Sequence, residues 1–169
     1  MTARLLGVLI LVLAASGTAA AKSRVGVGDA PPDYLGSTYE GHKVLLSDEP
    51  GKVTVISFWA TWCPPCRQEL PILEAMQRQA GKDRLRVIAI DVAEQKRGVR
   101  RSNKEIFEKY TLTFSFDLNG YIAHAFGFDA IPHMYILNKE GKVAFIHEGY
   151  DSNRLDGLSG ELNQLLAEK

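Results

Sequence analysis

The arrangement of hydrophobic and polar positions along the chain predicts an α/β fold. Two nearly continuous apolar runs, residues 53–59 and 86–92, are typical of strands that are covered on both faces. The segment between them is expected to form a helix from Cys63 to about Ala80. Because a strand, helix, strand order makes a parallel pair, these segments predict the centre of a sheet.

The flanking segments add shorter elements. A hairpin is predicted over residues 34–46 with its turn at Glu40-Gly41, and a second hairpin is predicted where Lys139-Glu140-Gly141 joins two apolar runs. The other expected elements are helices over residues 103–110, 121–126 and 155–166 and strands over residues 113–117, 133–138 and 143–147. The sum predicts a three-layer sandwich with a central mixed β-sheet flanked by helices, an N-terminal β-hairpin and an extra helix-strand insertion.

The N-terminal segment predicts export. Residues 1–21 carry a single charge, Arg4, followed by an apolar core and a run of small residues. The alternative is an uncleaved membrane anchor, for which residues 5–21 fall short of the roughly 20 apolar residues that a spanning helix needs. We expect residues 1–21 to be removed near Ala21, residues 22–32 to form a linker, and residues 33–169 to form one domain.

The charge balance gives no support for binding to nucleic acid. The chain has 20 Lys and Arg against 20 Asp and Glu, so its formal net charge is zero. We therefore expect no nucleic-acid partner, and we expect a monomer.

The chain has two cysteines, and both lie in the segment Trp62-Cys63-Pro64-Pro65-Cys66. A structural zinc site would need a second pair of ligands at short spacing, and no such pair follows in the sequence. A purely structural disulfide across so short a loop would restrain the unfolded chain by only about 2 kcal/mol. The interpretation that remains is a reversible dithiol, because a helix start favours the thiolate form of a cysteine.

The sequence resembles the thioredoxin superfamily and, within it, the TlpA-like branch that includes the ResA-like disulfide reductases. The resemblance covers nearly all of residues 22–169, and its most specific part is the segment from Phe58 to Arg67, Phe-Trp-Ala-Thr-Trp-Cys-Pro-Pro-Cys-Arg. The same resemblance includes the segment Val27-Gly28-Asp29-Ala30-Pro31, and it places a cis-proline at Pro132 and identifies residues 103–117 as the insertion of this branch. It implies an exported thiol-disulfide oxidoreductase that needs no cofactor.

Two positions depart from thioredoxin. Ser57 stands where thioredoxin has a buried aspartate in the first central strand, so a proton carrier must lie elsewhere. His133 stands where thioredoxin has a threonine after the cis-proline. A histidine in a strand is more often part of the core than a ligand, and both interpretations stay open here.

The resemblance and the helix start together predict the roles of the residues at the dithiol. We expect Cys63 to be exposed and to act as the nucleophile, and Cys66, one turn into the helix, to resolve the mixed disulfide. Trp62 and Pro64 are expected to contact the substrate, whereas Trp59 is expected to lie in the core. A cis peptide at Pro132 would present the backbone of Ile131 to an extended substrate segment.

Glu69 lies three residues after Cys66 on the same helical stripe. From the spacing alone, Glu69 would be a surface residue that follows the helix. The resemblance instead implies an acid near the dithiol that accepts the Cys66 proton. We list Cys63, Cys66 and Glu69 as the candidate catalytic residues.

The resulting prediction is an enzyme that reduces disulfides of protein clients in the periplasm or cell envelope, supplied by a membrane thiol donor. Cytochrome c precursors and copper-site assembly proteins are the clients that the resemblance suggests. Two alternatives are a copper-binding assembly factor that uses Cys63, Cys66 and His133, and an exported oxidase or isomerase. Pro64 and Pro65 both lack an N–H that could stabilise the Cys63 thiolate, which favours the reductase.

Overall fold

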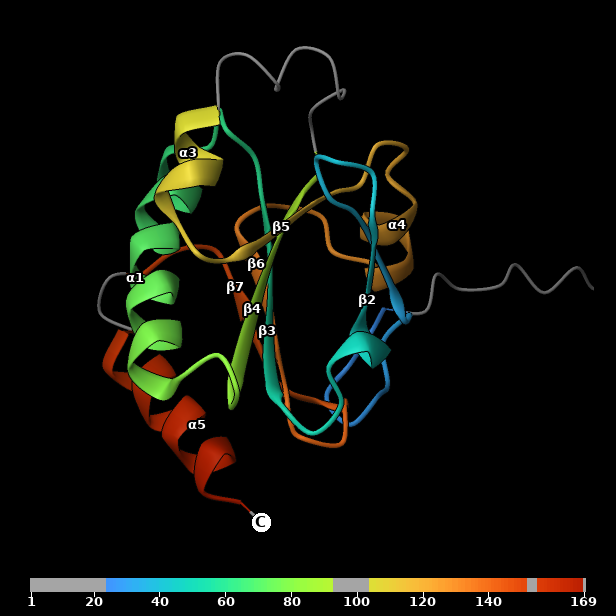
Figure 1. Cartoon of the computed structure of the whole chain (residues 1–169). Helices are drawn as coiled ribbons and strands as arrows, with labels where there is room; N and C mark the ends of the chain where they lie inside the picture. The colour runs from blue at the N-terminus through green and yellow to red at the C-terminus, as the bar shows by residue number, and fades with distance from the viewer. Residues whose placement is uncertain (1–23, 93–103, 152–154, 169) are drawn as a thin grey trace, which may run out of the picture.

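A seven-stranded mixed sheet forms the centre of the protein in the computed structural model, which describes residues 24–92, 104–151 and 155–168 (Figure 1). The strand order is β2-β1-β5-β4-β3-β6-β7. The strands are β1 (Tyr34–Ser37), β2 (Lys43–Leu45), β3 (Val53–Trp59), β4 (Leu85–Asp91), β5 (Thr113–Phe116), β6 (His133–Leu137) and β7 (Val143–Glu148). The helices are η1 (Leu46–Asp48), α1 (Pro64–Ala80), α3 (Lys104–Lys109), α4 (Tyr121–Phe126) and α5 (Leu155–Ala167).

The two apolar runs form the central strands, as predicted. Every residue of β3 and β4 is buried, and the two strands pair in parallel from Val53 opposite Leu85 to Trp59 opposite Asp91. Strand β5 continues the parallel set beside β4, while β6 runs antiparallel beside β3. The sheet is therefore mixed, and α1, which connects the parallel strands β3 and β4, covers one face of its centre.

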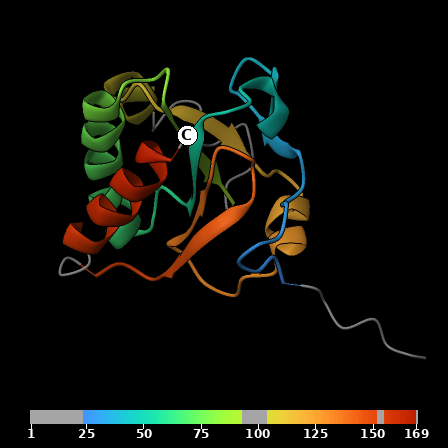
Figure 2. The ribbon, with the colours of Figure 1, turned by 90° about the horizontal axis from the view of Figure 1, so that it is seen from below.

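The helices lie on opposite faces of the sheet, which gives three layers (Figures 1 and 2). Helices α1, α3 and α5 cover one face, here called the α1 face, where Trp59, Leu73 and Leu162 belong to one hydrophobic cluster. Helix α4 covers the other face, here called the α4 face, where Phe58 and Phe126 belong to a second cluster. The alternation of side chains along β3 thus divides Phe58 and Trp59 between two separate cores.

The predicted hairpin and the predicted insertion meet in the sheet. Strands β1 and β2 form the hairpin, and β1 also pairs antiparallel with β5, with Ser37 opposite Phe116. Gly36 makes this approach possible, because a Cβ atom at this position would lie 2.7 Å from the carbonyl oxygen of Phe116 and its φ is +99°. The insertion therefore connects the N-terminal hairpin to the central strands.

Within the described ranges, no helix is long and apolar enough to span a membrane. The predicted export segment, residues 1–21, lies outside the described residues.

Candidate active site

Cys63 and Cys66 form a disulfide at the start of α1, directly after the end of β3. The two sulfur atoms are 2.00 Å apart and the two Cα atoms 5.3 Å apart. Cys63 is the N-cap residue of the helix, and Cys66 lies in its first turn. The predicted placement of the pair at a helix start is confirmed.

The expected exposure of Cys63 is wrong for this disulfide form. Cys63 is 3% exposed and Cys66 is 0% exposed. The physical reason is that both cysteines belong to the hydrophobic cluster of the α1 face, together with Trp59 and Leu70. The neighbouring Trp62 is 64% exposed, so it offers an apolar surface beside the disulfide, while Trp59 lies in the core as predicted.

Few described backbone N–H groups are placed to stabilise a thiolate at Cys63 in the reduced protein. The N–H of Cys66 donates to Cys63 Sγ at 3.3 Å. Pro64 and Pro65 occupy the two helical positions before it and have no N–H to donate.

Glu69 is buried on the α1 face, one turn after Cys66. Its side chain is 6% exposed, which excludes the surface placement that spacing alone suggested. The hydroxyl of Ser57, from β3, donates to Glu69 Oε2 at 2.8 Å. Burial raises the pKa of Glu69 to about 7, and the Ser57 hydrogen bond opposes that rise. A carboxyl in this state can exchange a proton near neutral pH.

The partnership of Ser57 with Glu69 was missed by the sequence reasoning. Ser57 is 0% exposed in an otherwise apolar strand. A buried hydroxyl needs a hydrogen-bond partner, and that requirement was the available signal. A carboxyl from α1 thus reaches β3 at Ser57, the position that departs from thioredoxin.

A small cavity lies beside Glu69. Its volume is about 30 Å³, and Met134, His147 and Tyr150 are among the residues that line it with Glu69. A volume of this size holds one or two water molecules. His147 Nε2 lies 2.7 Å from Glu161 Oε2 at this cavity wall.

The peptide bond between Ile131 and Pro132 is cis, as the resemblance predicted. The carbonyl of Pro132 accepts a hydrogen bond from the Gly149 N–H at 2.9 Å. Pro132 is buried and Ile131 is half-buried, and Ile131 contacts the clusters of both faces.

His133 does not join the cysteines, which corrects the copper-site alternative. It pairs with Phe58 across β3 and β6, and its ring stacks on Phe128 with the centroids 5.0 Å apart. Both aromatic rings belong to the α4 face, whereas the next residue, Met134, belongs to the cluster that holds the cysteines. Alternation along β6 therefore directs His133 to the opposite side of the sheet.

His133 is 3% exposed, and its Nε2 atom has no hydrogen-bond partner in the described chain. Burial lowers the pKa of His133, so the neutral ring is favoured. Within the described residues, no three His, Cys, Asp or Glu side chains are grouped so that they could hold a metal ion.

A strand that leads into a disulfide at a helix start, with a cis-proline in the segment before β6, defines a thioredoxin-fold dithiol protein. The chain belongs to the Redoxin family, whose model matches residues 26–163, and it is a TlpA/ResA-like member of the thioredoxin superfamily. Its enzymatic class is accordingly protein-disulfide oxidoreductase.

Known proteins of this class resemble the chain over most of its length. Thiol-disulfide oxidoreductase ResA of Geobacillus thermodenitrificans (strain NG80-2) is 32% identical over 150 residues, which cover 84% of each chain. Thioredoxin-like protein YneN of Bacillus subtilis (strain 168) is 36% identical over 135 residues, 76% of each chain. A crystal structure from Chlorobium tepidum, of a protein assigned as thiol:disulfide interchange protein DsbE, matches with a TM-score of 0.75 and 26% identity, covering 85% of this chain and 99% of that one.

Proposed function

We propose that this protein reduces disulfides of client proteins outside the cytoplasm. The observation that carries the proposal is the Cys63–Cys66 disulfide at the start of α1 with the buried carboxyl of Glu69 one turn further along. In the reduced enzyme, the Cys63 thiolate attacks a client disulfide and forms a mixed disulfide, and the first client sulfur leaves as a thiolate. Cys66 then attacks the Cys63 sulfur and releases the second client thiol. The client gains two electrons and two protons, and the enzyme ends as the disulfide.

The order of the two cysteines follows from their positions. Cys63 keeps a small exposed fraction and lies beside exposed Trp62, whereas Cys66 is fully buried. We therefore expect a client sulfur to reach Cys63 first, and Cys66 to attack only the sulfur of its neighbour. Trp62, Pro64, Ile131 and Pro132 are the residues that we expect the client to contact.

Glu69 acts in this proposal as the acceptor of the Cys66 proton. An ordinary thiol has a pKa of about 8.5, so proton transfer to a carboxylate of pKa about 7 costs about 2 kcal/mol. Transfer to a carboxylate with the usual value of 4.5 would cost about 5 kcal/mol. Burial of Glu69 thus makes it the better base for this step, and the adjacent cavity has room for the water that would carry the proton away.

The proposed direction is reduction. A strong oxidant needs a heavily stabilised thiolate, and here the Cys66 N–H donates to the Cys63 sulfur while Pro64 and Pro65 supply no donor. The reduced form therefore gains little stability from the helix start. We place the couple nearer to about −270 mV than to about −120 mV.

The proposed location is the periplasm or cell envelope, with residues 1–21 as the export segment or as an anchor. A membrane thiol carrier would reduce the Cys63–Cys66 disulfide again after each cycle. Cytochrome c precursors or copper-site assembly proteins are the proposed clients, on the strength of the family resemblance. Determining the first residue of the exported protein tests the role of residues 1–21. If this segment is removed, the first residue should be Lys22 or a near neighbour.

Equilibration of the purified protein with glutathione redox buffers tests the direction. We expect a midpoint near the reducing end of the range and reduction of insulin disulfides by the reduced enzyme. A midpoint above about −160 mV would contradict the reductase and would favour the oxidase or isomerase.

A further inference from the structure

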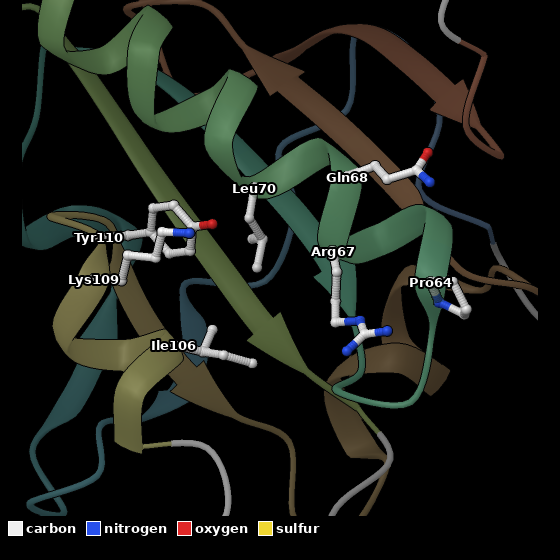
Figure 3. Close-up of a pocket in the computed structure, with 7 residues that line it drawn as sticks. All are labelled: Pro64, Arg67, Gln68, Leu70, Ile106, Lys109 and Tyr110. Atoms are coloured by element: carbon white, nitrogen blue, oxygen red, sulfur yellow. The ribbon is translucent and has the colours of Figure 1, made fainter.

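A groove of about 450 Å³ opens between α1 and α3 beside the disulfide loop. Figure 3 shows Arg67 and Leu70 reaching into it from α1. The opposite side is formed by Ile106 and Lys109 on α3 and by Tyr110, which follows α3. Pro64, which lies between the two cysteines in the sequence, forms its near end. The groove therefore begins at the redox centre and extends away from it along α1.

The two walls of the groove are held together by hydrogen bonds. The backbone N–H of Thr111, just after α3, donates to Glu74 Oε2 on α1 at 2.8 Å. The Thr111 hydroxyl also donates to Glu74 Oε1 at 3.0 Å, and the Gln77 side chain donates to the Thr111 carbonyl at 3.4 Å. These bonds join α1 to the end of α3, so the groove is a formed feature of the fold and needs no client to create it.

The lining of the groove is apolar at its floor and positive at its edges. Leu70 is 1% exposed and packs with Ile106 in the cluster of the α1 face. Arg67 and Lys109 are exposed at the edges, and none of the described residues that line the groove carries a carboxylate. Within the described chain, neither Arg67 nor Lys109 forms an ion pair. Lys109 lies over the Tyr110 ring, 5.4 Å from its centroid.

This combination of charge and shape fits one kind of occupant. A guanidinium binds a carboxylate through two parallel hydrogen bonds, and a nearby ammonium adds a second attraction. The apolar floor accommodates a neighbouring hydrophobic side chain of the same segment. The groove begins at Pro64, next to Cys63. A client segment that lies in the groove is therefore only a few residues, along the client chain, from the client cysteine that Cys63 attacks.

We propose that the groove binds a client segment that carries an Asp or Glu side chain near the reactive cysteine. The proposal rests on the proposed function, and it specifies the class of client. Attraction between exposed charges accelerates encounter and weakens with salt, so the preference is expected to be kinetic and salt-dependent.

The test compares synthetic peptides whose single cysteine is linked by a disulfide to 2-mercaptoethanol. Three peptides share one hydrophobic residue and differ only in two flanking positions, which are Glu, Gln or Lys. The second-order rate constant with the reduced enzyme is measured for each, and we expect the Glu peptide to react about fivefold faster than the Gln peptide and the Lys peptide to react slowest.

Two sets of variants separate the groove from general charge effects. In the double variant Arg67→Gln with Lys109→Gln, the rate constant of the Glu peptide divided by that of the Gln peptide is expected to fall toward one. In the wild type, a higher salt concentration is expected to reduce the same ratio. Both side chains are exposed, so the variants are expected to fold. Lys82→Gln removes an exposed charge beyond the far end of α1 and is expected to leave the ratio unchanged.

Equal rates for the three peptides, or a Glu preference that survives in the double variant, would overturn the groove proposal alone. A separate measurement with the uncharged bis(2-hydroxyethyl) disulfide reports on the wild-type dithiol itself. If the wild type reduces neither this compound nor any peptide, the reductase proposal falls and the groove proposal falls with it.

Discussion

The two faces of the sheet each bury a titratable side chain that follows a residue of the candidate site closely in the sequence: Glu69 is three residues after Cys66, and His133 directly follows the cis-proline Pro132. The two side chains are in opposite situations. Glu69 lies on the α1 face with Cys66 and has a hydrogen-bond donor in Ser57. His133 lies on the α4 face among aromatic rings, and its Nε2 atom has no partner in the described chain. Burial favours the neutral form of both groups, raising the pKa of Glu69 and lowering that of His133.

The comparison shows that nearness in sequence does not define the site. His133 directly follows the cis-proline, yet the sheet lies between its ring and the cysteines because successive residues of a strand point to opposite faces. Glu69 reaches the same zone as Cys66 because residues three apart in a helix share a side. The chemistry of the protein is therefore expected to respond to changes at Glu69 and to be insensitive to changes at His133.

The largest expected effect concerns the cysteines of the α1 face. Cys66→Ser keeps the attacking thiol and removes the resolving one, so mixed disulfides with clients should accumulate. Cys63→Ser should trap none. Non-reducing electrophoresis of cell extracts with an antibody to the protein measures both, and trapping by Cys63→Ser alone or by both variants equally would show that the nucleophile has been misassigned.

The next effect is on stability, and it follows from the raised pKa of Glu69. The folded state holds the Glu69 proton more tightly than the unfolded chain, so this carboxyl contributes stability below pH 4.5 that is lost as the pH rises through about 7. The shift corresponds to about 3 kcal/mol. Urea unfolding of the oxidised protein at pH 4.5 and pH 8 should show that loss in the wild type and not in Glu69→Gln. Equal pH dependence of the two proteins would mean that Glu69 titrates normally.

A smaller effect is expected on the rate of the resolving step. Above pH 7 the Glu69 carboxylate can accept the Cys66 proton, whereas the neutral amide of a glutamine cannot. Glu69→Gln should therefore release the client from a preformed mixed disulfide about tenfold more slowly than the wild type at pH 8. At pH 5.5 the two proteins should differ little because the wild-type carboxyl is protonated. Stopped-flow measurement across this pH range tests the expectation.

Ser57→Ala is the matched control for that experiment. It keeps the carboxyl and removes the hydrogen bond that lowers the Glu69 pKa, so the inflection of the wild-type rate profile should move upward and should not disappear. A Ser57→Ala profile that coincides with the Glu69→Gln profile would show that the hydroxyl, and not the carboxyl, carries the pH dependence.

The smallest expected effect is at His133. Its lowered pKa means that the unfolded chain binds the proton more tightly, so stability falls as the pH drops below about 6.5. His133→Phe keeps an aromatic ring against Phe128 and removes the unpartnered Nε2, and it should raise stability by about 1 kcal/mol at pH 5 and by less at pH 7.5. Unfolding curves measure this, and rates of thiol exchange should match the wild type. Slower thiol exchange in this variant would show that His133 takes part in the reaction.

The sequence alone determined the elements of this protein and the position of its dithiol. The apolar runs at residues 53–59 and 86–92 are typical of covered strands, and the segment from Trp62 to Cys66 lies where the first of them is followed by a helix. These features are local, because hydrophobic period and helix-start chemistry depend on residues a few positions apart. The resemblance added the cis peptide at Pro132, which no local pattern indicates.

The tertiary structure alone decided which side chains share the site. Spacing alone favoured a surface position for Glu69, and the packing of α1 on β3 instead buried it against Ser57, which lies 12 positions away. The same packing placed Cys63 in the core where exposure was expected, and the register of β6 directed His133 to the α4 face. Burial, hydrogen bonding and the resulting pKa shifts arise from contacts between distant segments, and no local pattern encodes them.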